Sequence, residues 1–208
     1  MNANLDNQPT ESSLFEEEPV GSKTDVKDEE KSSVSSLDSK IVKFEESEQL
    51  SEYQQTLLRA ASQKSSDIIY SKGLSYTLRL MYVIINEAST KLRIVFFGDD
   101  IKYLYYKQIF DSINSAIKKC VDVQILSYKE VDDDLCELYG NKIKKIPNTV
   151  YEEFLKSSPA FRSFVTGDEG MYRFDFGIDS VSGLGSFNDP DMTSKFNALH
   201  DSYTNALN

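Results

Sequence analysis

Hydrophobic residues along this chain recur either at helical spacing or in short, nearly unbroken runs. In segments 48–63 and 75–88 they return every three or four residues, as in helices with one buried face. Residues 67–70 predict a short extended segment between these helices. The run 92–97 is apolar except for one arginine and ends at Gly98-Asp99-Asp100, so it predicts a strand buried on both faces.

A second helix and strand follow directly. Apolar residues recur at helical spacing over 104–119, and residues 120–126 are again apolar and β-branched. A strand, helix and strand within about 35 residues form a βαβ unit, which makes the two strands parallel. We therefore predict an α/β fold with a mixed sheet, a parallel βαβ core and flanking helices.

The C-terminal third predicts a loop, a helix, a hairpin and a final helix. Residues 131–148 are mostly polar and predict the loop, and residues 149–156 predict the helix. Two apolar runs, 161–166 and 171–176, flank a Gly-Asp-Glu-Gly turn and predict the hairpin. Asp189 precedes a proline and is a suitable cap for the last helix. The buried stripe expected on that helix is Met192, Phe196, Leu199 and Tyr203.

Residues 1–48 differ from the rest because they hold clusters of Ser, Glu, Asp and Lys with few large apolar residues. Such a stretch buries too little apolar surface to offset the entropy of ordering. We expect a disordered acidic tail over 1–48 and one α/β domain over 49–208. The short apolar segments 14–15 and 41–44 are either docking segments that order on a partner or parts of an inert solvating tail.

The charge of the chain resides mainly in this tail. Residues 1–52 carry 14 acidic and 5 basic side chains, whereas residues 53–208 carry 20 and 18. The tail therefore favours basic partners, and the nearly neutral domain leaves protein and nucleic-acid partners both open. The absence of a signal peptide and of any long apolar run predicts no membrane segment, and Cys120 and Cys136 are read as buried or incidental thiols of a cytoplasmic protein.

Two short motifs near the C-terminus suggest a family. In the segment 161–168, Phe161, Ser163 and Asp168 stand at the spacing of a His, any residue, Lys, four residues, Asp signature. A Gly-Ser-any-Asn tetrapeptide follows at 185–188. In these motifs and in its order of elements, the chain over 50–208 resembles one half of a phospholipase D-like protein.

The resemblance implies a degenerate half rather than an enzyme. In that family the histidine attacks phosphorus, and a phenylalanine ring can neither attack nor leave. We therefore expect a non-catalytic binding module with no cofactor or metal, engaging a protein or nucleic-acid partner. The ligand-binding residues that the resemblance and a neighbouring basic patch imply are Asp168, Ser186, Asn188 and Arg162.

An alternative interpretation is a carboxylate-dependent hydrolase or transferase. Asp99 and Asp100 follow a buried strand at the edge where open α/β sheets bind ligands, and with Asp168 they form a candidate Mg²⁺ site. The competing interpretation is that Asp99 or Asp100 caps the next helix.

The remaining candidate residues give weaker indications of a functional site. His200, the single histidine, is expected at the surface or half-packed on the last helix. The acidic run 132–134 reads as a solvated loop, and Lys142, Lys144 and Lys145 as a small basic patch near Arg162. A homodimer formed through an edge strand is a further possibility.

Overall fold

The computed structural model describes residues 37–157, 163–168, 170–176 and 181–207. Most of the predicted acidic tail, including segment 14–15, lies outside these residues. Phe161 and Arg162 lie outside them as well, so the predictions made for these two side chains stay predictions.

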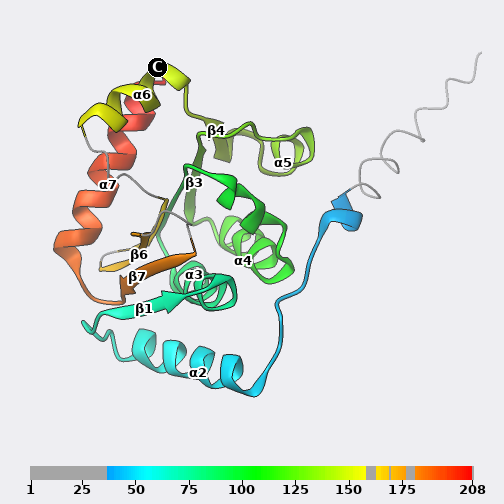
Figure 1. Ribbon diagram of the computed structural model, residues 1–208, viewed down its shortest axis with the longest axis vertical. Coiled ribbons are helices and arrows are strands. Elements are labelled where there is room, and N and C mark those ends of the chain that lie inside the picture. The colour runs from blue at the N-terminus through cyan, green and yellow to red at the C-terminus, as the bar shows by residue number, and fades with distance from the viewer. Residues whose placement is uncertain (1–36, 158–162, 169, 177–180, 208) are drawn as a thin grey trace, which may run out of the picture.

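The domain is built on one seven-stranded mixed sheet with helices on both faces (Figure 1). The strand order is β1-β7-β6-β5-β2-β3-β4. The strands are β1 (Ile69–Lys72), β2 (Lys91–Phe96), β3 (Asp122–Ser127), β4 (Ile143–Lys145), β5 (Phe164–Gly167), β6 (Met171–Asp175) and β7 (Ser182–Ser186). The helices are α2 (Glu48–Ser62), α3 (Leu74–Glu87), η1 (Asp99–Tyr105), α4 (Lys107–Lys118), α5 (Asp133–Tyr139), η2 (Gly140–Lys142), α6 (Asn148–Ser157) and α7 (Pro190–Asn205).

The predicted βαβ core is confirmed. Strands β2 and β3 are parallel over their whole length, with Lys91 opposite Asp122 and Phe96 opposite Ser127, and α4 lies between them in the chain. Strand β4 adds a third parallel strand at the edge. On the other side of β2, strands β5, β6, β7 and β1 are all antiparallel to their neighbours, and β5 with β6 is the predicted hairpin.

Alternation along β2 assigns the two faces of the sheet. Leu92 and Ile94 pack with α3 and α4 in the larger core cluster, whereas Val95 packs with Phe164 and Tyr203 in a smaller cluster beneath α7. Figure 1 shows α7 on one side of the sheet and α3 and α4 on the other. Arg93 lies on the α7 side of this buried strand, where its charge is paired with Asp122.

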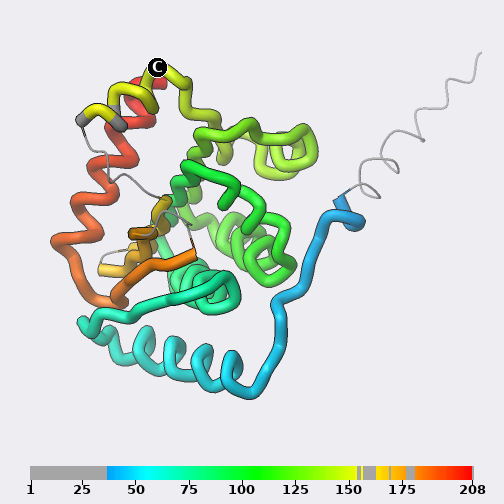
Figure 2. Tube along the Cα trace, viewed as in Figure 1, coloured from blue at the N-terminus to red at the C-terminus, as the bar shows by residue number. Residues whose placement is uncertain are grey.

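A segment preceding α2 forms a strap, defined as residues 40–46, across the helices. Val42 bonds the backbone of η1 and α4, donating to Tyr105 O (2.9 Å) and accepting from Lys107 N (2.7 Å). Phe44 is buried in the main core, and Arg79 donates to the Glu45 carbonyl at 2.6 Å. Figure 2 follows the strap as the blue trace that leads into α2. Segment 41–44, read from the sequence as a docking segment or inert tail, therefore packs on its own domain.

The structure corrects several sequence predictions. Residues 131–148 are not a loop, because they contain α5, η2 and β4. Residues 182–186 form strand β7, an element that the sequence pattern did not predict. His200 is fully buried rather than at the surface. Cys120 and Cys136, expected as buried or incidental thiols, are exposed and form no disulfide, so they are not buried thiols.

The end of the chain follows the prediction more closely. Asp189 caps α7 by accepting from Met192 N at 3.0 Å, and Pro190 is its first residue. Among the helices that the structure describes, none is both long and apolar enough to cross a bilayer.

Candidate functional site

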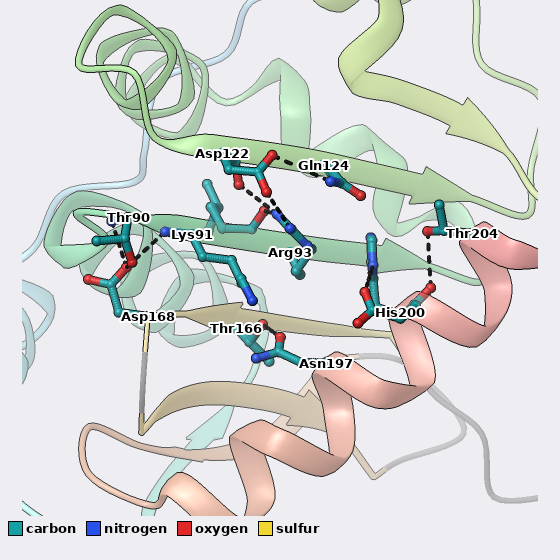
Figure 3. Close-up of polar contacts among 12 residues, drawn as sticks. Thr90, Lys91, Arg93, Asp122, Gln124, Thr166, Asp168, Asn197, His200 and Thr204 are labelled. Atoms are coloured by element: carbon teal, nitrogen blue, oxygen red, sulfur yellow. Dashed lines mark hydrogen bonds and ion pairs between the residues drawn. The ribbon is translucent and has the colours of Figure 1, made fainter.

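Asp168 forms the turn between β5 and β6 and joins it to the start of β2 (Figure 3). Its backbone has a left-handed φ of 42°. Its carboxylate accepts five hydrogen bonds of 2.7–3.0 Å, from the amide and hydroxyl groups of Ser89 and Thr90 and from the Lys91 amide. Both oxygens are therefore engaged by the protein itself.

These donors also control the charge of the group. Burial by itself raises the pKa of a carboxyl, but the five donors, led by the Lys91 amide, outweigh burial and lower the pKa of Asp168 to about 2. Asp168 is thus ionised at neutral pH and clamps β5 to β2. These hydrogen bonds explain why an acidic residue stands at position 168, and the explanation requires no ligand.

Ser186 and Asn188 lie at the same end of the sheet as Asp168. Ser186 is buried at the end of β7, and its Oγ accepts from Asn188 N at 3.3 Å. Gly170, two residues after Asp168, accepts from Asp189 N at 2.8 Å. Asn188 is exposed. The resemblance placed these residues in one site, and the structure brings Asp168, Ser186 and Asn188 to the same end of the sheet.

The glycine of the same tetrapeptide has a structural explanation. A Cβ on Gly185 would overlap the Tyr172 carbonyl oxygen of the neighbouring strand β6. Gly185 is therefore required for the close packing of β7 against β6.

Ser163 lies at the opposite end of β5 from Asp168. Its side chain is only 5% exposed, its Oγ accepts from Phe97 N at 2.9 Å, and it donates to Asp100 at 2.5 Å. The four residues of β5 lie between Ser163 and Asp168, so five residue steps separate the two by roughly 17 Å at the usual rise per residue. The structure thus does not bring Ser163 together with Ser186 and Asn188, because these two lie at the Asp168 end.

A buried charged cluster occupies the Ser163 end of the sheet. Arg173 forms an ion pair with Asp175, both almost fully buried, and also donates to Thr77 Oγ1 at 3.2 Å. Burial, followed by the charges of Asp100 and Asp175, raises the pKa of the nearby Tyr103. No pattern in the sequence indicates this cluster, because its members come from α3, η1 and β6.

The proposed carboxylate site of Asp99, Asp100 and Asp168 is not assembled. Asp168 contacts the first residue of β2, whereas Asp99 and Asp100 follow its last residue, roughly 20 Å away for a six-residue strand. Asp99 and Asp100 do not cap η1 either, since they lie in its first turn after Gly98. Within the described parts of the chain, no three His, Cys, Asp or Glu side chains gather closely enough to hold a metal.

His200 points from α7 onto the sheet, toward the Arg93 and Asp122 ion pair (Figure 3). Burial, followed by the charge of Arg93, lowers the pKa of His200 to about 4. Its Nδ1 lies 3.5 Å from Asp201 Oδ1, and its Nε2 has no hydrogen-bond partner among the described residues. The ring is therefore neutral and inaccessible at neutral pH.

Two clefts flank α7 on the same face of the sheet. The larger has a volume of about 640 Å³ and is lined by Thr90, Lys91, Asp168, Pro190, Asp191, Thr193, Ser194, Asn197, Ala198 and Asp201. The smaller, of about 230 Å³, lies over β3 and β4 and includes Lys142, Lys144 and Thr204. Sequence reasoning missed both clefts, although Lys142 and Lys144 had been noted as a basic patch.

The other charged motifs have local roles. Lys145, the third lysine of the patch, pairs with Glu130. Asp132, predicted in a solvated loop, instead caps α5 by accepting from Leu135 N at 3.0 Å and also accepts from the Tyr105 hydroxyl. Lys40 of the strap pairs with Asp134 at 2.5 Å. The acidic run thus begins a helix and holds the strap.

No family model matches the sequence, and no curated protein matches it either. Similar solved structures include Nuc from Salmonella typhimurium, a phospholipase D family member, with a TM-score of 0.46 and 15% identity over 67% of this chain and 93% of Nuc. NucT from Helicobacter pylori has a TM-score of 0.47 and 13% identity over 67% and 97%. TrmBL2, an archaeal chromatin protein with a novel mode of DNA binding, has a TM-score of 0.45 and 13% identity over 85% and 65%.

Proposed function

We propose that this chain is a non-catalytic binding module with a phospholipase D-like fold, which engages a protein or nucleic-acid partner. The observation that carries the proposal is the state of Ser163. At the position of the family's lysine, its hydroxyl is buried and already bonded to Phe97 N and Asp100.

The histidine content of the chain supports the same conclusion. His200 is the single histidine of the sequence, and it is fully buried on α7. A nucleophile must reach the phosphorus atom with a free lone pair, and the Nε2 of His200 is enclosed between α7 and the sheet. The described structure therefore offers no accessible imidazole for the attack on phosphorus that the resemblance would imply.

The proposal includes three further points that rest on the sequence. The acidic residues before the strap favour a basic partner, and the cysteines fit a reducing, cytoplasmic setting. The third point is a homodimer formed through a sheet edge.

The test is a phosphodiesterase assay on the purified full chain, using bis-(4-nitrophenyl) phosphate and single-stranded DNA with and without Mg²⁺. We expect no turnover above a buffer control. Turnover that is abolished by His200→Ala, but retained by the matched α7 variant Lys195→Ala, would overturn the proposal.

A second arm tests binding. Gel-shift and pull-down experiments compare the full chain with a chain that begins at residue 37. We expect a saturable complex with a protein or a nucleic acid. Failure of both versions to form any saturable complex would contradict the binding role.

A further inference from the structure

Exposed apolar side chains gather around one edge strand of the sheet. Of the five large apolar side chains that are exposed among the described residues, four lie on or beside β1, namely Ile68, Tyr70, Leu74 and Phe176. Tyr70 is 67% exposed, and its ring packs edge-to-face on Phe176 with 6.5 Å between the ring centroids. Exposed apolar groups that cluster in this way are typical of a surface that another segment covers.

The exposed ring of Tyr70 lies on the same face of the sheet as α7, beyond the strands that α7 covers. Tyr70 is aligned with Leu184 of β7, and Leu184 is aligned with Phe174 of β6. Phe174 packs against Phe196 of α7, whereas Leu184 is only half-buried and Tyr70 is exposed. Because aligned residues share a face, the apolar surface of the sheet continues past α7 as far as β1.

The backbone of β1 also has a hydrogen-bonding edge that no described strand occupies. β1 stands at the end of the strand order, and directly after it the Gly73 amide donates to Val181 O at 2.7 Å. Residues that bond the neighbouring strand alternate with residues that face away from it, so the amides and carbonyls of Tyr70 and Lys72 face outward. Helix α2 runs beside this edge (Figure 1), and its Tyr53 hydroxyl contacts the Tyr70 carbonyl at 3.5 Å, the upper limit of a hydrogen bond.

The opposite edge of the sheet is protected, whereas β1 is not. The three-residue strand β4 carries Lys144 and Lys145, and Pro147 follows it closely. Short edge strands with lysine and proline resist pairing with a further strand. β1 instead presents the exposed ring of Tyr70 beside a single lysine, Lys72. Of the two edges, β1 is therefore the one suited to accept another strand.

The chain itself contains a segment with matching chemistry. Residues 14–18, which precede the described part of the chain, read Leu-Phe-Glu-Glu-Glu and join two adjacent large apolar residues to three acids. Lys72 is exposed and makes no ion pair with any residue that the structure describes. The apolar surface and the unpaired cation on β1 thus complement the apolar and acidic residues of the segment.

The intervening chain is long enough for this contact. Residues 19–36 separate the segment from the first described residue, and a chain of that length spans up to roughly 60 Å when it is extended. A folded domain of about 170 residues is roughly 40 Å across, so β1 lies within reach. The other apolar segment noted in the sequence, 41–44, already packs on its own domain through Phe44.

We propose that the edge of β1 accepts an additional strand and that residues 14–18 of the same chain supply it. In a parallel register, Phe15 lies beside Tyr70 and Glu17 beside Lys72, because side chains two residues apart share a face. A homodimer through this edge would require the segment to leave, so the two contacts exclude one another. The contact within the chain does not depend on the partner of the proposed function.

Amide hydrogen exchange of the ¹⁵N-labelled full chain, followed by NMR, tests the contact. The added strand would bond the outward amides of Tyr70 and Lys72, whereas the Ser71 amide faces β7. We expect the two outward amides to exchange about tenfold faster in Phe15→Asp than in the wild-type chain, which corresponds to docking in about nine of ten molecules. The Ser71 amide should not change, and the matched variant Leu5→Asp should behave as the wild-type chain does.

A charge exchange tests the register. Lys72→Glu should speed exchange of the Tyr70 amide, and the further substitution Glu17→Lys should slow it again, because the two side chains then attract each other. Glu16→Lys in place of Glu17→Lys should restore less, since residue 16 points to the opposite face.

Two outcomes of the first measurement would overturn the proposal, and so would one outcome of the second. The first is equal exchange in the wild-type chain and in Phe15→Asp. The second is protection that rises with protein concentration, because a second copy would then supply the strand. In the charge exchange, equal rescue by Glu16→Lys and Glu17→Lys would contradict the register.

Discussion

Ser163 donates a hydrogen bond to Asp100, a residue 63 positions earlier in the chain, and both side chains are buried. The bond links the start of β5 to η1 at the end of the sheet where the resemblance expects a phosphate-binding lysine. A hydroxyl held in this way stabilises the fold, which gives the first prediction.

Ser163→Ala should destabilise the domain by about 1–3 kcal/mol, because it leaves the Phe97 amide and the Asp100 carboxylate each short of a partner. Urea unfolding followed by circular dichroism measures the change. The matched control is Ser62→Ala, whose exposed hydroxyl bonds only the backbone of its own helix. Equal effects of the two substitutions would contradict the structural role of Ser163.

Asp168 predicts a loss of stability in acid. Its folded pKa of about 2 lies below the ordinary value of 3.8, so the unfolded chain takes up the proton first as the pH falls. The contribution is fully present above about pH 4 and is lost toward pH 2. Allowing for solvent screening of a partly exposed carboxyl, it is on the order of 1 kcal/mol. Unfolding of Asp168→Asn should lack this part of the pH dependence.

His200 also predicts a loss of stability in acid, over a pH range that lies above the range for Asp168. Its folded pKa of about 4 lies below the ordinary value of 6.5, and the unfolded chain therefore binds the proton more readily between these values. Stability should fall as the pH drops from 6.5 toward 4, by about 2–3 kcal/mol. The neighbouring charges are Arg93 on β2, Asp122 on β3 and Asp201 on α7.

The check is urea unfolding of the wild-type chain and of His200→Gln across pH 4 to 7. The variant should show a flatter profile in this window. An unchanged slope would mean that His200 titrates normally in the folded protein.

The strap predicts that the domain extends before residue 49. Phe44→Ala should destabilise the protein by about 3 kcal/mol, as for a large aromatic side chain removed from a core. Val42→Ala is the control, because Val42 is 51% exposed and serves mainly through its backbone. A chain starting at residue 49 should unfold at lower urea concentration than one starting at residue 37.

The class of the fold was predictable because its central elements have strong patterns. The buried run in β2, the helical spacing of α4 and the second run in β3 define a parallel pair without knowledge of any distant contact. Asp189 and Pro190 marked the start of α7 for an equally local reason.

The missed elements depend on contacts that a linear pattern does not reveal. Strand β4 has three residues, and β7 contains two glycines that close packing against β6 requires. Helix α5 did carry a signal, since Asp132 precedes Leu135 and Tyr139 at cap and helical spacing. The run of three acids obscured it.

The candidate site was predictable only in part. The turn position of Asp168 could be read from its neighbours, but its five donors come from residues 89–91. The burial of His200 depends on how α7 is rotated against the sheet, which buries Thr193 and His200 fully and leaves Leu199 only partly buried. The larger cleft beside α7 could not be predicted either, because it is lined by the start of β2 and by α7, which lie far apart in the sequence.

The position of Phe44 couples events outside the domain to its interior. Because the strap ends in a core residue and in the Glu45 carbonyl held by Arg79, any partner that pulls the preceding residues outward must also extract an aromatic ring. Binding of a partner to the acidic residues before the strap and unfolding of the core would then be thermodynamically linked. A change in the free energy of one reaction would appear as a change in the free energy of the other.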